Sequence, residues 1–187
     1  MFRLLFVSLV SLMMARHATA LFLGNNSYGV PEFVIDLSLQ PEDRFREVTR
    51  FFKNEALEVL ESVESRIPLI NSAFSKLDFM FKWNFPVYFE EMTGIADELG
   101  VKVHSAILLN FMIDVETYCS QIIVRQPDGT LLHSRTVDYG PKDKFRKIIY
   151  NAKVMKGDVY LYDAVMLAGY TGLYTAFKPG AFSYAEN

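Results

Sequence analysis

The segment at residues 117–140, TYCSQIIVRQPDGTLLHSRTVDYG, places the strongest constraint on how this 187-residue chain can fold. Two β-rich stretches flank the turn sequence QPDG, which has proline at the second position of a β-turn and glycine at the fourth. The pattern predicts an antiparallel hairpin. If Gln126 pairs with Thr130, the same register places Cys119 opposite Val137.

This predicted hairpin brings three reactive residue types to one end of a sheet. Arg135 and Asp138 flank the position opposite Cys119. A fixed guanidinium near the sulfur favours the thiolate, and a carboxylate can orient a protonated amine. The same residues also fit an ordinary salt bridge beside a buried cysteine, and a register slip of one residue would move them apart. The pattern by itself leaves both interpretations open.

Cys119 is the only cysteine in the chain, so it has no partner for an intrachain disulfide. It is therefore an inert buried side chain, half of an intermolecular bridge, or a reactive thiol. A reactive thiol needs a base, and neither His104 nor His133 lies in a supporting motif. Cutting the Tyr118–Cys119 bond would expose an α-amino group, whose ordinary pKa of about 7.7 to 8 suits proton transfer. The residues thus allow an N-terminal nucleophile.

The first twenty residues predict entry into the secretory pathway. Residues 1–20 contain a short basic start, an apolar run and an A-x-A site, which together are typical of a signal peptide cut after Ala20. The sequence Asn25-Asn26-Ser27 is a glycosylation sequon and predicts a glycoprotein. A net charge of −3 without a basic stripe argues against nucleic acid as a partner. The spacing of the histidines and acidic residues suggests neither a metal site nor a cofactor.

Periodicity predicts a mixed chain in which one strand and several helices precede the hairpin. We expect a strand at 32–39, helices at 42–66, 87–99 and 103–113, and later strands at 147–154 and 159–166. Residues 169–187 are interpreted as turn-rich. The aromatic segment at 69–89 fits either an interhelical core or a lipid-facing surface.

Residues 90–140, EEMTGIADELGVKVHSAILLNFMIDVETYCSQIIVRQPDGTLLHSRTVDYG, resemble the acid ceramidase family, which includes the N-acylethanolamine-hydrolysing acid amidases. The resemblance rests on the E-M-x-G-I-A-x-x-x-G helix at Glu91–Gly100, on Asn110 nine residues before Cys119, and on the hairpin end from Arg135 to Tyr139. The blocks PEFVIDLSLQPEDRF and AGYTGLYTAFKPGAFS resemble the family as well. The chain departs from the family pattern at Ser120 and Gln121 and in the loss of an asparagine after Arg135.

The resemblance implies an α+β fold, the αββα sandwich of N-terminal-nucleophile hydrolases. It implies a proenzyme cut before Cys119, with 21–118 as a strand-plus-helical α-subunit and 119–187 as the start of the β-subunit core. Cys119 is then nucleophile and, through its new amine, base, while Arg135 and Asp138 are supporting catalytic residues. No metal and no cofactor are implied.

The implied activity is a cysteine amidase that hydrolyses the amide bond of fatty-acyl lipids, either ceramide or N-acylethanolamine. The implied setting is an acidic lysosomal or extracellular compartment, with the lipid met at a membrane or vesicle surface. The family pattern continues beyond Asn187, so the resemblance leads us to expect a C-terminally truncated chain whose activity needs further sequence. The alternatives are a non-catalytic relative that acts as a secreted lipid-binding or interaction protein, and an α+β fragment with a buried cysteine.

Overall fold

The computed structural model describes residues 21–25, 29–66, 78–116, 118–138 and 142–186. Its strands are β1 (Leu21–Asn25), β2 (Pro31–Asp36), β3 (Tyr118–Arg125), β4 (Leu131–Asp138), β5 (Ile149–Lys156), β6 (Val159–Leu167), β7 (Thr175–Lys178) and β8 (Phe182–Ala185). Its helices are α2 (Arg46–Phe51), α3 (Lys53–Arg66), α5 (Asp78–Asn84), α6 (Pro86–Leu99), α7 (Val103–Glu116) and α8 (Lys142–Phe145), with 3₁₀ turns η1 (Pro41–Asp43) and η2 (Arg146–Ile148). The signal-peptide prediction falls outside the described residues.

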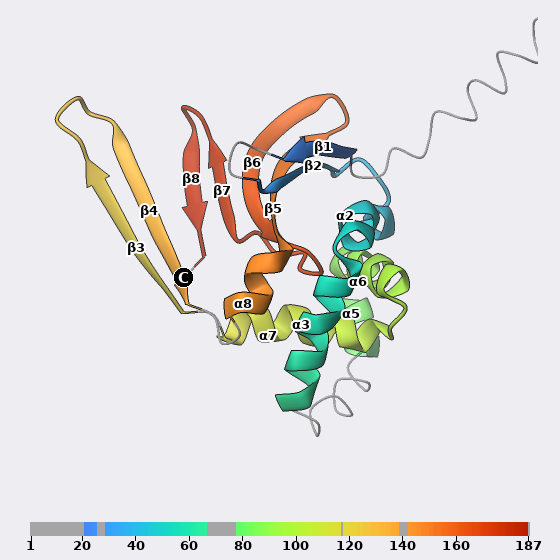
Figure 1. Ribbon diagram of the computed structural model, residues 1–187. Helices are drawn as coiled ribbons and strands as arrows, with labels where there is room; N and C mark the ends of the chain where they lie inside the picture. Colours follow the sequence, from blue (N-terminus) through green and yellow to red (C-terminus); the bar gives the residue numbers. More distant parts are fainter. Residues whose placement is uncertain (1–20, 26–28, 67–77, 117, 139–141, 187) are drawn as a thin grey trace, which may run out of the picture.

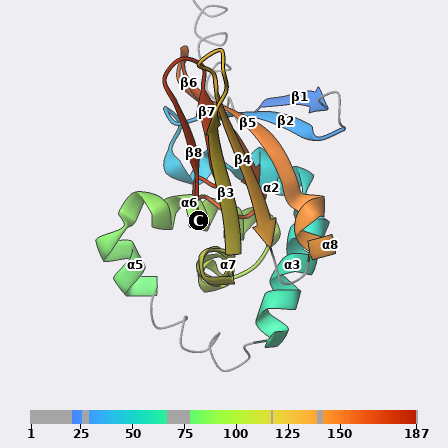
Figure 2. The same ribbon diagram turned by 90° about the vertical axis from the view of Figure 1, so that its left-hand side faces the viewer.

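The elements stack as helices, a large sheet and a hairpin. Six strands form one sheet in the order β1-β2-β5-β6-β7-β8, and β3 pairs with β4 in a separate two-stranded sheet. The main helices lie on one side of the six-stranded sheet, and the hairpin stands on the other side in front of β7 and β8 (Figures 1 and 2). The predicted α+β class is confirmed, with a helical layer followed by two β layers.

The six-stranded sheet joins the parts of the chain before and after Cys119. Strand β2 pairs in parallel with β5, with Phe33 opposite Ala152 and Ile35 opposite Val154. All four of these side chains are buried against the helical layer. The two regions predicted to become separate subunits therefore share one hydrophobic core, and the subunit division itself stays a prediction.

Helix α7 runs through the middle of the helical layer and ends three residues before Cys119. Its side chains from Ala106 to Asn110 are buried, as are Met112 and Ile113. A helix apolar on nearly all sides is expected where protein surrounds it. This burial anchors the chain immediately before the hairpin begins.

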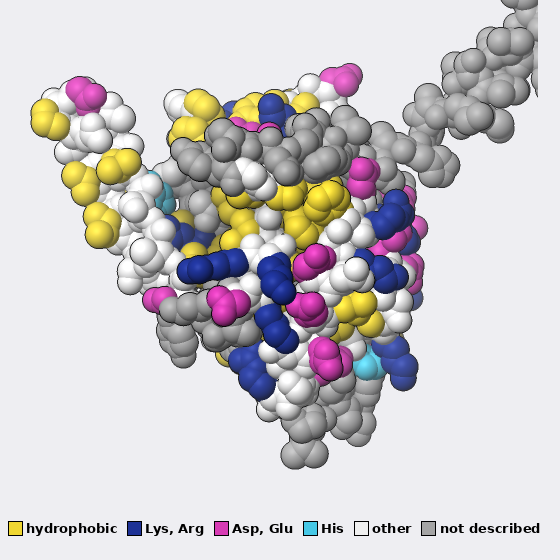
Figure 3. Space-filling model, viewed as in Figure 1, with side chains coloured by type: hydrophobic (Ala, Val, Ile, Leu, Met, Phe, Trp, Pro, Cys, Tyr) yellow, Lys and Arg dark blue, Asp and Glu magenta, His cyan; other side chains and the backbone are white. Residues whose placement is uncertain are grey.

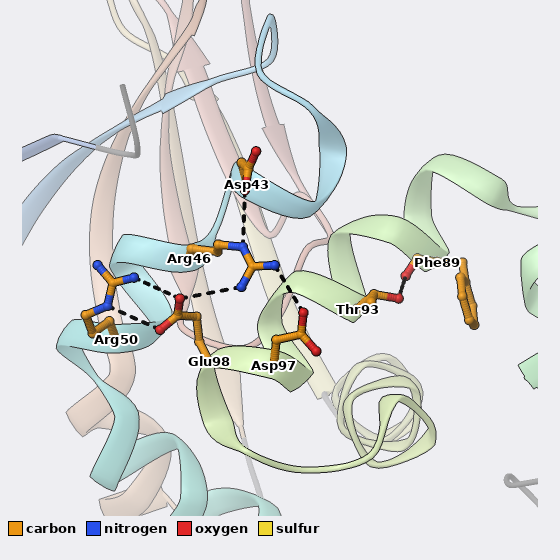
Figure 4. Close-up of polar contacts among 7 residues, drawn as sticks. All are labelled: Asp43, Arg46, Arg50, Phe89, Thr93, Asp97 and Glu98. Atoms are coloured by element: carbon orange, nitrogen blue, oxygen red, sulfur yellow. Dashed lines mark hydrogen bonds and ion pairs between the residues drawn. The ribbon is translucent and has the colours of Figure 1, made fainter. Parts of the chain in front are cut away.

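Helix α6 is held close to η1 and α2. A Cβ atom at Gly94 would lie 1.8 Å from the backbone oxygen of Glu42, so only glycine allows the two elements to approach this closely. Arg46 of α2 bonds Asp97, and Arg50 donates to Glu98 across 2.8 Å (Figure 4). Predicted helix 87–99 is thus confirmed as α6, and it ends at Gly100 with a φ of 76°.

The structure corrects two predictions. The helix expected over 42–66 is divided into η1, α2 and α3, with a break at Phe52. The apolar stripe nevertheless holds across the break, because Phe45, Val48, Phe52, Val59 and Val63 are all buried. The turn-rich interpretation of 169–187 was incomplete, since the segment also contains β7 and β8, four residues each, joined through a turn at Gly180. Turn residues dominate such a short window and hide the alternation.

Candidate active site

The hairpin has the register that its turn predicts. The Gln126 backbone N–H donates to the Thr130 carbonyl across 2.8 Å, and the Gly129 N–H closes the turn on Gln126. Cys119 pairs with Val137 and Gln121 pairs with Arg135. The sulfur and the guanidinium therefore come from diagonal positions on one face of the hairpin.

Arg135 makes the contact that defines the site. Its Nη2 donates to the Cys119 Sγ across 3.2 Å. Its Nη1 donates to the Tyr174 carbonyl and to the Thr175 hydroxyl, each across 2.5 Å, and its Cζ lies 3.9 Å from the centre of the Tyr174 ring. A guanidinium held by a carbonyl, a hydroxyl and an aromatic face is a fixed positive charge beside the sulfur.

Asp138 lies next to this site along β4 but on the other face. It pairs with Tyr118, one position from the Cys119–Val137 pair. Side chains alternate along a strand, so Asp138 points away from the face that carries Arg135 and Val137. It is also exposed. The structure thus brings Arg135 to Cys119, and the catalytic role of Asp138 stays a prediction.

The two histidines considered as bases are engaged elsewhere. His133 Nε2 lies 3.1 Å from the Gln121 Oε1, and its Nδ1 lies 2.9 Å from the Ser183 hydroxyl. The Gln121 amide donates in turn to the Ala185 carbonyl across 3.0 Å. These bonds attach the hairpin to β8. His104 lies 3.9 Å from the Asp78 carboxylate, between α7 and α5.

An apolar cavity opens where the hairpin faces β7 and β8. It has a volume of about 620 Å³, and Arg135 and His133 supply polar groups on its wall. Most of the rest of its lining is apolar, including Leu131, Leu132 and Phe182. Hydrophobic side chains also lie exposed along the projecting hairpin (Figure 3). Cys119 does not line this cavity, and its thiol meets the cavity through Arg135, which lies on the wall and contacts the sulfur. A fixed cation in an apolar cavity can hold a polar carbonyl group that carries a hydrocarbon chain.

Sequence reasoning missed the residues that hold Arg135 in place. Tyr174 and Thr175 lie where β7 begins, inside the stretch interpreted as turn-rich. The signal that could have found them is the resemblance of AGYTGLYTAFKPGAFS to a family block. Within the described ranges, no group of three or more histidine, cysteine or acidic residues could hold a metal ion.

Comparison with known proteins finds relatives along most of the chain. It is 31% identical over 180 residues to acid ceramidase from Bos taurus, an alignment that covers 84% of this chain and 45% of the relative. Identity is 27% to a probable acid ceramidase from Caenorhabditis elegans, covering 83% of this chain and 44% of that one. It is 24% to the N-acylethanolamine-hydrolyzing acid amidase of Mus musculus, covering 82% and 43%. No protein-family model matches the chain. The chain spans less than half the length of these relatives.

Proposed function

This chain is related to the acid ceramidase family, and from that relation we propose that it carries the nucleophile of a cysteine amidase acting on fatty-acyl lipids. The observation that carries the proposal is the 3.2 Å contact between the Arg135 guanidinium and the Cys119 sulfur. We include ceramide and N-acylethanolamine in the proposed substrate class, because the names of the relatives contain both chemistries.

The proposed reaction begins when the Tyr118–Cys119 bond is cut and Cys119 becomes an N-terminal residue. Its α-amino group then takes the thiol proton, and Arg135 stabilises the thiolate. The sulfur attacks the acyl carbonyl, and the amine returns the proton to the departing nitrogen. Water then cleaves the thioester, which releases the fatty acid and restores the thiol. One residue supplies both nucleophile and base.

Asp138 gains its proposed role through that cut. In the intact chain the Cys119 nitrogen is a backbone amide of β3, opposite Val137. Once cut, this nitrogen is an amine at the free end of the strand, one register position from Asp138, and it becomes charged when it takes the thiol proton. A carboxylate at that distance along the edge can orient the amine by a charge-assisted hydrogen bond.

The proposed function is tested by detecting transfer of the acyl group from the amide to Cys119. We expect cut protein that also carries the further sequence implied by the resemblance, incubated with a fatty-acyl amide at acid pH, to form a thioester on Cys119, seen as an acyl mass increase on the Cys119 peptide, and to release fatty acid. Cys119→Ala should show neither. Binding of the amide without acyl transfer would instead support the non-catalytic lipid-binding alternative.

We also propose that α5 meets the lipid surface from which such substrates come. Phe79 and Trp83 are 76% and 78% exposed, and their rings stack with centroids 6.3 Å apart. The short helix stands at the side of the molecule, away from the sheet (Figure 2). Large exposed aromatic side chains on one helix are typical of an interfacial contact. Among the described residues, no helix has both the length and the apolar composition that a membrane span requires.

Replacing both exposed rings is expected to weaken vesicle binding. Phe79→Ser with Trp83→Ser should reduce binding to lipid vesicles by at least about tenfold, because each buried aromatic side chain contributes roughly 1.5–3 kcal/mol. Vesicle cosedimentation measures this loss. Val159→Ser removes an exposed apolar side chain from the start of β6 and should bind as the wild type does. Equal binding by all three proteins would rule out α5 as the membrane contact.

Secretion, glycosylation at Asn25 and residence in a lysosomal or extracellular compartment complete the proposal. They rest on the signal-peptide pattern at 1–20 and on the sequon. Asn25 is the last residue of β1, at an edge of the six-stranded sheet.

A further inference from the structure

The hydroxyl group of Tyr170 lies between two carboxylates from distant parts of the chain. It donates to the Asp114 Oδ1 across 2.5 Å and lies 3.3 Å from the Glu186 Oε2. A phenol has only one proton to donate. If that proton goes to Asp114, the second contact becomes a hydrogen bond only when Glu186 is protonated and donates to the Tyr170 oxygen. The complete chain of bonds therefore contains one extra proton.

This chain of bonds connects to the site through Tyr174. The Glu186 backbone N–H donates to the Tyr174 carbonyl across 3.1 Å, and the same carbonyl accepts from Arg135. The Tyr170 and Tyr174 rings meet edge to face with centroids 6.2 Å apart. Asp114 lies near the end of α7, shortly before Cys119. The three residues thus tie the segment that holds Arg135 to the helix that leads into Cys119.

We propose that Asp114, Tyr170 and Glu186 form a proton-dependent latch that positions Arg135 against Cys119 at acid pH. The latch rests on the proposed function, because an amidase of an acidic compartment benefits from a site that is completed there. At neutral pH both carboxylates are charged and face the same hydroxyl. Glu186 then has no proton to share, and the tie between β8 and α7 is weaker.

The charges around the latch agree in sign with this behaviour. Burial raises the pKa of Glu186 and Asp114 raises it further, while the hydrogen bond with Tyr170 and the charge of Arg135 oppose this rise, and the net pKa is raised. Burial also raises the pKa of Asp114, against the hydrogen bond from Tyr170. Burial raises the pKa of Tyr88, on α6, to about 12 and raises that of Tyr170, so neither phenol ionises in the range concerned.

The direction of these shifts fixes the pH window. A carboxyl group whose pKa is higher in the folded state binds its proton more tightly there. Its stabilising contribution is therefore complete below its unfolded pKa of about 4 and is lost as pH rises through the folded value. The latch should stabilise the acid form and loosen towards neutral pH.

The first test uses Glu186→Gln, which supplies a neutral N–H donor at every pH. Between pH 5 and pH 7, we expect the thermal midpoint of the wild type to fall by about 3 °C more than that of Glu186→Gln, in which the hydrogen bond does not depend on pH. In a Tyr170→Phe background, Glu186→Gln should have no such effect. Tyr160→Phe is the matched control, because the Tyr160 hydroxyl donates to the Asp163 carboxylate in an exposed hydrogen bond within β6. Parallel pH profiles for Glu186→Gln and wild type would overturn the latch.

The second test reads the site through its single thiol. At pH 6, Glu186→Gln should raise the rate of iodoacetamide alkylation of Cys119. Tyr170→Phe should lower that rate by about tenfold, because a displaced Arg135 stabilises the reacting thiolate less. Tyr160→Phe should match the wild type. Equal rates in all four proteins would show that the three residues are structural and do not position Arg135. Neither measurement needs amide hydrolysis, so failure of the latch and failure of the amidase proposal are separate outcomes.

Discussion

The protein held at acid pH is expected to separate into two pieces, the second of which begins at Cys119. The thiol attacks the preceding Tyr118 carbonyl, so a carbon–sulfur bond forms as the carbon–nitrogen bond breaks and the leaving nitrogen takes up a proton. Water then cleaves the thioester, which leaves a carboxylate on Tyr118 and a free thiol on Cys119. Acid pH supplies the proton for the nitrogen. Intact mass and N-terminal sequencing identify the cut.

Cys119→Ala is expected to abolish this cleavage entirely, because the variant has no nucleophile at the position. Ser120→Ala is the matched control: its side chain is exposed on the neighbouring position of the same strand, and it should be cut as the wild type is. Cleavage at another bond would remove the basis for an N-terminal nucleophile. So would cleavage of the Cys119→Ala variant at the wild-type rate.

The part of the site that sequence predicted correctly depends on local geometry. The QPDG turn fixes which residues face each other, so the Cys119–Val137 pair follows without knowledge of the rest of the fold. The proximity of Arg135 to the sulfur follows from the same register. The sequence could also have shown that Asp138 and Arg135 lie on opposite faces of the hairpin. Side chains alternate along a strand, and positions 135 and 138 differ by an odd number.

What sequence could not predict depends on pairing between distant segments. The parallel pairing of β2 with β5 joins residues more than a hundred positions apart. The role of Tyr174 and Thr175 in holding Arg135 requires β7 to lie beneath the hairpin, and a four-residue strand gives almost no periodic signal. The aromatic segment before α6 shows the same limit. Composition could not separate core from surface, whereas the structure exposes Phe79 and Trp83.

Replacement of Arg135 is expected to have the second-largest effect on processing and on acyl transfer. Arg135→Met removes the cation 3.2 Å from the sulfur and leaves the Tyr174 carbonyl and the Thr175 hydroxyl without this donor. Hydrogen bonds to charged groups contribute about 1.5–3 kcal/mol, so the cleavage rate should fall roughly 10- to 100-fold. Arg135→Lys keeps the charge but not the planar guanidinium group, so its cleavage rate should lie between those of Arg135→Met and the wild type.

Asp138→Asn separates a role in the reaction from a role in stability. The side chain is exposed, so its loss should leave the thermal midpoint nearly unchanged, while processing or acyl transfer falls at least about tenfold, about 1.4 kcal/mol of barrier. Because the proposed role begins only when the amine exists, acyl transfer by already cut protein should suffer more than the cut itself. If Arg135→Met and Asp138→Asn both react like the wild type, neither side chain acts on the sulfur or on its amine, and the contacts of Arg135 only support the fold.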